Sequence, residues 1–518
     1  MYDREEKIME ILKAIMAFIP MIWLLISLGV LKIPTHKACL WAVIITAALA
    51  LFVFDMKAIF LGEAVIEGAI YALVSICWII VSALLVYNIT LKTGALEIIK
   101  TMLTNISNDR RMQALIIGFA FGGFLEAVAG FGTAVAIPAG ILIAMGFKPL
   151  KAAVVCLVSN TVPVALGVLG VPVFSLAEAS GLEIEKLAFY MCIQLLPFAV
   201  LLPVLIVYIV TDDVKKLKGA ILPALLSGAA FAVGQTVVAM YVAVNLAATV
   251  GALCSLLVLV LYCRVSKEKE NYRFDFDENV NESIGAISGQ EALNAWCPYI
   301  LILVLIIVVQ FLPFLQQSPF LLKKQFYFGE GGKALTFNWL TSGGSLLFIA
   351  AIIGGTLQKM KLKEIFVTLK ETLVQVKMSI LTTVLVVVLA KVMTYSGMIA
   401  ESAALIASIS GVFFPVISPM IGTLGTFITG SDTSSNILFG GLQQQTAANL
   451  GMDQYWIVAG NGAGATAGKM ISPQSISIAA ASTNNAANES EMMKSTIKYC
   501  IFYVILMGIC VCFGQLFI

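Results

Sequence analysis

Apolar segments long enough to cross a membrane recur along the chain, and they constrain its fold more than any other feature. A helix needs roughly 17–25 predominantly apolar residues to cross the hydrocarbon core of a bilayer. Because 60% of all residues are hydrophobic and only 12% are charged, no water-soluble fold could bury so much apolar surface. We therefore predict an all-α polytopic protein of the cell membrane with about twelve spans. The candidates are residues 14–31, 38–54, 69–91, 150–175, 187–210, 219–238, 241–263, 293–314, 339–358, 378–396, 453–483 and 497–517.

Several classes of function lack the residues that they need. The formal net charge is +2 without a long basic tract, so nothing supports binding to nucleic acids. His36 is the single histidine and the ten cysteines form no CxxC pair, so we expect no metal site. The stretch before Lys469 is similar to a phosphate-binding loop, but Met470 stands where that motif needs serine or threonine. We expect neither an enzyme nor a bound cofactor.

The charges of the short loops predict how the chain is oriented in the membrane. Lysine and arginine mark cytoplasmic loops, and they accumulate in residues 92–111, 211–218, 264–273 and 359–377. Three of the four charged residues in loop 176–186 are glutamates, which suits the outer side. These assignments agree only if both termini lie outside and if segments 112–147 and 413–450 each enter and leave on one side. We therefore predict that these two Gly-rich segments are re-entrant hairpins.

Short motifs in and after these hairpins occur twice at a nearly constant separation. GFGT (130–133) matches GSDT (430–433), and SNTVPVALGVLGVP (159–172) matches GNGAGATAGKMISP (460–473). The loop charges give the two copies opposite orientations, which is the signature of an inverted-repeat secondary transporter. We assign the first repeat, the linking spans with a cytoplasmic loop, and the second repeat to residues 1–210, 211–292 and 293–518.

Glycine and proline inside two candidate spans predict broken helices near the midplane of the membrane. We expect breaks within 150–175 and, at Gly460–Gly468, within 453–483. Irregular backbone at this depth is tolerated only beside protein or a water-filled cavity, and an exposed helix N-terminus binds anions. Asn160 and Asn461 occupy matching positions in the two repeats. The predicted substrate-binding residues at the hairpin tips and broken helices are Thr133, Asn160, Thr161, Ser431, Thr433, Ser434, Asn461, Thr466, Ser472 and Gln474.

One carboxylate, Glu126, interrupts the apolar first hairpin. It lies in GFLEAVAGFG, and no other charge occurs between Arg111 and Lys148. A charged residue at the centre of a membrane costs roughly 2.5–3.5 kcal/mol on insertion scales. Glu126 is either a proton-coupling residue in a polar cavity or a structural partner of a lysine or hydrogen bond that holds the hairpin. We favour proton coupling, because ionisable residues inside membrane spans are functional by default.

Other charged residues in apolar surroundings have two interpretations each. Asp432 is a second proton-coupling residue or the N-cap of the helix that follows it, and these roles are compatible. Lys469 pairs with a substrate carboxylate, with Glu126 or with Asp432, unless it snorkels to the membrane surface. Its distance from both ends of its span favours a substrate-binding role. Lys391, late in its span, either snorkels outward or faces the transport pathway, and we favour snorkelling.

Motifs throughout the chain resemble the L-lactate permease family: FGGFLEAVAGFGTAVAIPAGIL, VSNTVPVALGVLGVP, TGSDTSSNILFGGLQ and AGNGAGATAGKMISPQSISIA. The resemblance covers nearly the whole chain. It implies symport of protons with L-lactate and related 2-hydroxymonocarboxylates such as D-lactate and glycolate, two inverted repeats with hairpins, and an elevator motion. The alternative is a sodium-coupled carboxylate carrier of the same architecture, in which backbone carbonyls, Asn160 and Asn461 bind Na⁺.

Overall fold

Helices make up nearly all of the described chain, and the predicted polytopic helical class is confirmed. The computed structural model describes residues 12–31, 33–130, 132–266, 272–274, 287–317, 319–332, 334–482 and 489–518. Within these ranges, eleven helices have the length and hydropathy to cross a membrane. They are Leu12–Val30, Thr35–Phe52, Ala58–Lys92, Arg110–Val128, Ile184–Thr211, Ile221–Tyr241, Val244–Val265, Gly289–Val309, Leu362–Tyr395, Met398–Thr429 and Glu489–Gln515.

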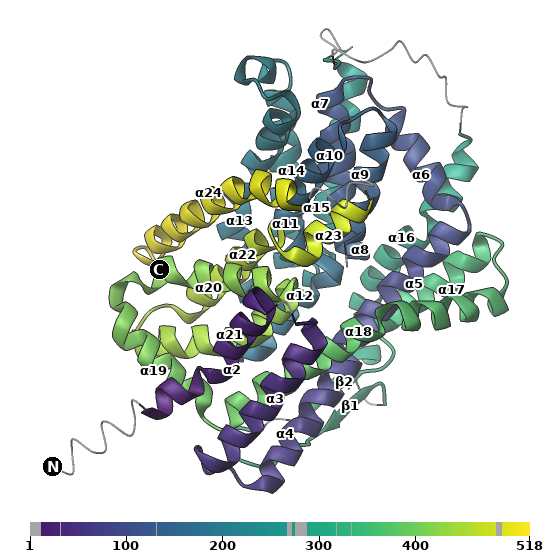
Figure 1. Ribbon diagram of the computed structural model, residues 1–518. Coiled ribbons are helices and arrows are strands. Elements are labelled where there is room, and N and C mark those ends of the chain that lie inside the picture. Colours follow the sequence, from purple (N-terminus) through teal and green to yellow (C-terminus); the bar gives the residue numbers. More distant parts are fainter. Residues whose placement is uncertain are drawn as a thin grey trace.

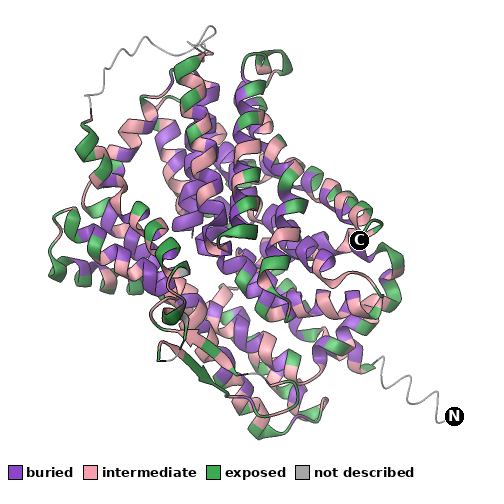
Figure 2. Cartoon of the chain, turned by 180° about the vertical axis from the view of Figure 1, so that it is seen from behind, coloured by how far each residue is buried: buried purple, intermediate pink, exposed green. Residues whose placement is uncertain are grey.

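Large apolar side chains cover much of the outer surface. Phe52 and Phe311, for example, are 82% and 78% exposed, and Figure 2 shows buried residues in the middle of the molecule and exposed ones at its periphery. Such a surface is unfavourable in water but matches lipid tails. Arg110–Val128 differs from the other spans, because its apolar window is 100% buried inside the protein.

One set of helices packs around the longest helix, α18 (Leu362–Tyr395). In this set, which we call the α18 group, α18 contacts α3, α4 and α5, while α17 contacts α5 and α16. Figure 1 shows α3 and α4 alongside α18, with α5, α16 and α17 beyond its other end. The bounds are α3 (Thr35–Phe52), α4 (Ala58–Tyr71), α5 (Trp78–Lys92), α16 (Gly289–Gln310) and α17 (Gly343–Leu357).

A second set, which we call the hairpin group, contains two pairs of helices joined by tight turns. These are the first helical hairpin, α8 (Gly122–Val128) with α9 (Thr133–Ala144), and the second, α20 (Phe414–Thr429) with α21 (Asp432–Asn449). The other members are α10 (Pro149–Ser159), α11 (Thr161–Val164), α12 (Gly167–Ser180), α13 (Ile184–Thr211), α14 (Ile221–Tyr241), α15 (Ala247–Val265), α22 (Gln454–Lys469), α23 (Pro473–Ser482) and α24 (Glu489–Gln515). In the first hairpin, α8 packs against α15 and α9 against α10. In the second, α20 lies along α22 and α21 packs against α12.

Short elements connect these helices. They are α2 (Ile19–Leu24), α6 (Ala95–Thr104), α7 (Arg110–Gln113), α19 (Met398–Ser410), η1 (Leu25–Val30), η2 (Ala72–Cys77), η3 (Ala114–Phe121), η4 (Val214–Leu217), η5 (Val244–Leu246), η6 (Pro313–Gln316) and η7 (Gly411–Phe413). A small antiparallel sheet is the exception to the all-α expectation. Its strands are β1 (Leu321–Lys324) and β2 (Leu335–Asn338), with Leu321 opposite Asn338.

The break predicted within 150–175 is present. The chain forms α10, α11 and α12 in place of one helix, and Val168, Leu169 and Gly170 all have positive φ (47°, 52° and 82°). Two non-glycine residues in this region of backbone space are unusual. They change the chain direction at the start of α12, which packs against α21 and also contacts α8.

The break predicted at Gly460–Gly468 is wrong, because α22 runs unbroken through all of these residues and ends at Lys469. The glycines have a different role. A Cβ at Gly464 would lie 2.2 Å from the carbonyl oxygen of Pro419, and one at Gly468 would lie 2.2 Å from that of Thr423. Small residues at every fourth position allow two membrane helices to touch through their backbones. These glycines therefore allow α22 to pack closely against α20.

The basic segment 359–377, predicted as a cytoplasmic loop, is mostly helix. It forms the first half of α18, which begins at Leu362. No glycine or proline interrupts residues 362–395, and the Glu364 carboxylate accepts a hydrogen bond from the Lys361 N–H (3.0 Å) at its start. Lysine and glutamate are good helix formers, so the helix extends past the apolar part. The predicted span 339–358 is shorter than expected, because α17 covers only Gly343–Leu357.

The same order of elements occurs twice along the chain. In each half, a long helix (α5 or α18) ends before a glycine in the left-handed conformation, and a shorter helix (α6 or α19) follows. These glycines are Gly94 (φ 76°) and Gly397 (φ 83°). Each half then has a helical hairpin, a divided helix and a long helix, α13 or α24. This duplicated order is a necessary condition for the repeat predicted from the sequence.

Candidate functional site

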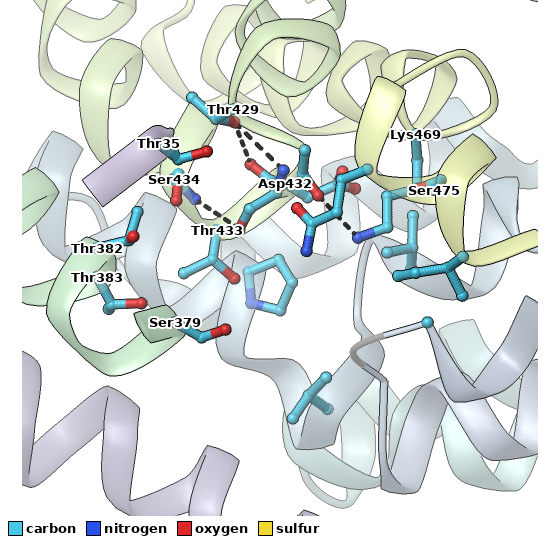
Figure 3. Close-up of a pocket in the computed structure, with 18 of the residues that line it drawn as sticks. Thr35, Ser379, Thr382, Thr383, Thr429, Asp432, Thr433, Ser434, Lys469 and Ser475 are labelled. Carbon is cyan, nitrogen blue, oxygen red and sulfur yellow. Dashed lines mark hydrogen bonds between the residues drawn. The ribbon is translucent and has the colours of Figure 1, made fainter. Parts of the chain in front are cut away.

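A cavity of about 280 Å³ lies between the second hairpin tip, the first hairpin, α18, α23 and the start of α3 (Figure 3). Sites for drug-sized ligands usually measure about 300–1,000 Å³, so this one suits a small molecule. Its lining includes one lysine, two carboxylates and many hydroxyls. The polar lining residues are Thr35, His36, Glu126, Ser379, Thr382, Thr383, Thr429, Ser431, Asp432, Thr433, Ser434, Lys469, Gln474 and Ser475.

The tip of the second hairpin places Asp432 in the cavity wall. Gly430 turns the chain with a φ of 72°, and the Ser431 hydroxyl accepts a hydrogen bond from the Ser434 N–H (3.2 Å). Ser431 is therefore the N-cap of α21, and the predicted capping role of Asp432 is wrong. Asp432 lies in the first helical turn, where the helix dipole favours a negative charge. It is 2% exposed, and neither carboxylate oxygen has a hydrogen-bond partner among the described residues.

Lys469 ends α22 and reaches the same hairpin tip. Its ammonium donates a hydrogen bond to the carbonyl oxygen of Gly430 (3.1 Å) (Figure 3). Gln474 of α23 packs over the other side of the turn, where a Cβ on Gly430 would come within 2.2 Å of its Oε1. Lys469 also attracts the charges of Asp432 and Glu126. Its side chain thus points toward the hairpin tip and the cavity.

Glu126 lies near the end of α8, at the turn of the first hairpin. It is 2% exposed, and its Oε2 has no hydrogen-bond partner within the described chain. Two glycines make room for it, since a Cβ on Gly167 would lie 3.1 Å from its Cγ and one on Gly130 would lie 3.4 Å from its Oε1. The structure therefore brings Glu126, Asp432 and Lys469 to one cavity from three separate segments.

The predicted polar residues divide into those that line the cavity and those that do not. Thr133 and Thr161 lie outside its lining, and each hydroxyl is bonded to nearby backbone. Thr133 donates to the Gly130 carbonyl (2.8 Å), and Thr161 donates to the Val158 carbonyl (2.7 Å). Those that line the cavity are Ser431, Thr433, Ser434 and Gln474.

Asn461 belongs to a buried amide network, not to the cavity lining. It is fully buried, and its Oδ1 accepts a hydrogen bond from Gln443 Nε2 (3.1 Å). Its Nδ2 donates to Asn436 Oδ1 (3.1 Å), and Asn436 donates in turn to the Pro172 carbonyl (3.1 Å). This network ties α22 to α21 and α12.

The remaining predicted residues surround the cavity without lining it. Asn160 is 2% exposed, and its side chain lies beside the Glu126 carboxylate. Neither of its two side-chain amide atoms has a hydrogen-bond partner among the described residues. The Ser472 hydroxyl accepts a hydrogen bond from a backbone N–H in the first turn of α23 (3.2 Å), and Thr466 bonds to the Tyr503 hydroxyl (3.0 Å). Both hydroxyls are therefore engaged within the protein.

Sequence reasoning missed the residues that α18 and α3 contribute. Ser379, Thr382 and Thr383 line the cavity from α18, and Thr35 and His36 line it from the first turn of α3. Serine and threonine are common in membrane helices, so their presence alone indicates little. Their spacing of i, i+3 and i+4 on one helix face was the available signal.

A second charged cluster lies around Lys391, which does not snorkel outward as predicted. Its ammonium pairs with Glu67 of α4 (3.0 Å) and with Glu178 of α12 (2.9 Å). The Tyr395 hydroxyl donates a hydrogen bond to Glu67 (2.6 Å). Glu67 and Lys391 belong to the α18 group, whereas Glu178 belongs to the hairpin group. The Lys391–Glu178 pair therefore connects the two groups.

Comparison with known proteins gives consistent relatives across the whole chain. An L-lactate permease of Streptococcus iniae is 40% identical over 86% of this chain and 93% of its own length. The glycolate permease GlcA of Escherichia coli and an L-lactate permease of Bacillus subtilis are 35% and 34% identical, each over 96% of this chain and 95% of the relative.

Solved structures are only weakly similar to this chain. The YdaH transporter of Alcanivorax borkumensis has 13% identity and a TM-score of 0.46, over 84% of this chain and 85% of its own. The sequence relationship is stronger, because the family model described as L-lactate permease matches residues 13–517. The chain therefore belongs to the L-lactate permease family.

Proposed function

We propose that this protein is a secondary active transporter that couples the movement of L-lactate and related 2-hydroxymonocarboxylates, including D-lactate and glycolate, to protons. The names of its relatives support this substrate class, since they are lactate and glycolate permeases. The observation that carries the proposal is the meeting of Glu126, Asp432 and Lys469 in one cavity of small volume. No resident cofactor takes part.

The charges of the cavity provide a reason for coupling. When all three groups are ionised, the two carboxylates and one ammonium leave one negative charge in excess. A lactate anion would add to this excess, and repulsion between like charges is strong where water is scarce. If Glu126 or Asp432 first takes up a proton, the anion enters and the total charge equals that of the empty, ionised site. Substrate and proton would therefore bind together.

The cavity also offers two attractive groups for a carboxylate. Lys469 supplies a positive charge that forms strong, charge-assisted hydrogen bonds. The first turn of α21, from Ser431 to Ser434, supplies the positive end of a helix dipole. Both lie at the tip of the second hairpin, so the substrate carboxylate would bind there.

We further propose that the chain consists of two inverted repeats, residues 1–210 and 293–518, with re-entrant hairpins and both termini outside the plasma membrane. The duplicated order of elements supports the repeat. An elevator motion would move the hairpin group past the α18 group. The position of the cavity between these groups supports that motion, because a ligand there contacts both.

The test is uptake of [14C]L-lactate by purified protein in liposomes, with an inward proton gradient and with Na⁺ replaced by choline. We expect uptake that follows the proton gradient, is indifferent to Na⁺ and collapses when a protonophore is added. A requirement for Na⁺ would favour the sodium-coupled alternative. No lactate uptake under any gradient would show that the substrate class is wrong.

A further inference from the structure

Three hydroxyl side chains form a polar patch on an otherwise apolar stretch of α18. Ser379, Thr382 and Thr383 line the cavity together (Figure 3). Their i, i+3 and i+4 spacing places them on one helix face. The next residues, 384–390, are an uninterrupted run of valine, leucine and alanine. The patch is therefore confined to the part of the helix that faces the cavity.

Two hydroxyls of this patch lack the hydrogen bond that other threonines of α18 make to their own helix. A helical threonine usually donates to the carbonyl one turn earlier, as Thr394 does (2.8 Å). Within the described chain, the hydroxyls of Ser379 and Thr383 make no hydrogen bond, although both residues line the cavity. Thr382 donates to its own helix (2.9 Å), which leaves its oxygen free to accept. The patch thus offers both donors and acceptors to a ligand.

The charged groups of the cavity all come from one of the two bodies. Glu126, Asp432 and Lys469 come from the hairpin group, while α18 contributes only hydroxyls and Met378. A carboxylate binds an ammonium about twice as strongly as a neutral donor. A ligand that contacts both bodies would therefore direct its carboxylate to Lys469 and a neutral hydrogen-bonding group to α18. A 2-hydroxymonocarboxylate has these two groups on adjacent carbons.

We propose that Ser379, Thr382 and Thr383 form the subsite for the 2-hydroxyl group and select 2-hydroxy acids over unsubstituted monocarboxylates. This inference rests on the proposed function and adds the residues that determine its specificity. A hydroxyl-binding site rejects an analogue without the hydroxyl, because its own polar groups then stay unpaired.

The test measures inhibition of [14C]L-lactate uptake in proteoliposomes by unlabelled L-lactate and by propionate, which lacks only the 2-hydroxyl. Propionate should inhibit the unaltered protein more weakly than lactate does. Thr383→Val keeps the side-chain volume, and Ser379→Ala removes the neighbouring hydroxyl. In both variants we expect the apparent affinity for lactate to fall by up to about tenfold, while that for propionate is unchanged or improved.

Two controls separate selection from folding. Thr383→Ser restores a hydroxyl and should restore the preference for lactate. Thr394→Val makes the same substitution on the same helix, outside this cavity, and should leave the preference unchanged. If Thr383→Val does not assemble, Ser379→Ala still tests the inference.

Equal loss of lactate and propionate binding in the variants would overturn the inference, because the patch would then position any carboxylate. Equal inhibition of the unaltered protein by lactate and propionate would also overturn it, while the proton-driven uptake of lactate would still support the proposed function. Absence of lactate uptake by the unaltered protein would reject the proposed function itself, and the two failures are therefore distinguishable.

Discussion

Glu126 and Asp432 come from different hairpins, yet both line one cavity, and their charges interact. Lys469 attracts both charges, and the charge of Glu126 repels that of Asp432. Protonation of one carboxyl therefore changes the field at the other. Interacting groups of this kind bind protons as a pair and not as two independent sites. The unit of proton coupling would accordingly be the pair together with Lys469.

The first prediction at this scale concerns Glu126→Gln. The amide cannot release a proton and leaves the cavity neutral, as in the protonated state, so lactate should still bind. We expect loss of lactate accumulation driven by a pH gradient, with lactate–lactate exchange retained. Uptake and counterflow in proteoliposomes measure the two activities. Glu97→Gln, on the exposed face of α6, is the control. A Glu126→Gln variant that still accumulates lactate would assign Glu126 a structural role.

Residues of the site differed in how well their sequence context predicted them. Glu126 and Lys469 were identified because a charge in an apolar segment is costly and therefore conspicuous. Asn461 was assigned to the substrate by its match with Asn160, but packing gives it amide partners far along the chain. Ser379 gave no comparable signal, because whether a hydroxyl bonds to its own helix or faces a cavity depends on neighbours from other segments.

The contact between α20 and α22 shows how glycine acts at the scale of elements. Glycine was interpreted as a helix breaker in α22, since it is a poor helix former in water. In membrane helices it also allows close packing, and periodicity distinguishes the two uses. Gly460, Gly464 and Gly468 recur at every fourth position. In α10–α12, by contrast, the break coincides with positive φ angles at consecutive residues.

Gly464→Ala should therefore destabilise the protein, although alanine is the better helix former. Its Cβ would lie 2.2 Å from the Pro419 carbonyl oxygen, so α20 must shift, and overpacking of this kind costs about 1–3 kcal/mol. Thermal unfolding in detergent measures the effect as a lower Tm. Gly140→Ala in α9 is the matched control, because no atom lies within 4 Å of its added Cβ. Equal melting temperatures for the two variants would contradict this account of the contact.

At the scale of the whole molecule, the two helix groups meet at the cavity and at the Lys391 cluster. The class of fold, most spans and the broken helix within 150–175 followed from hydropathy and from glycine and proline positions. The grouping of helices did not, because it depends on contacts between distant segments such as α18 and α4. An elevator motion would require the contacts between the groups to change during transport, whereas contacts inside one group persist.

Cross-linking across the Lys391 cluster tests that motion. In a background without the native cysteines, Glu178→Cys with Lys391→Cys places one thiol on each group. A short bifunctional thiol reagent should then arrest uptake. Glu67→Cys with Lys391→Cys is the matched control, because both thiols lie in the α18 group and uptake should survive. Uptake by fully cross-linked Glu178→Cys/Lys391→Cys protein at its untreated rate would rule out movement of α12 relative to α18.

The enclosure of Arg110–Val128 has a consequence for how the chain is made. This segment is apolar enough to leave the insertion machinery as a lipid-exposed helix, yet in the finished protein its apolar window contacts no lipid. Its wall includes α13 and α15, which end at Thr211 and Val265. Those helices do not exist when Glu126 is synthesised. The first hairpin is thus translated early and completed late, and until then its carboxyl group must remain in a temporary environment of lipid, water or chaperone.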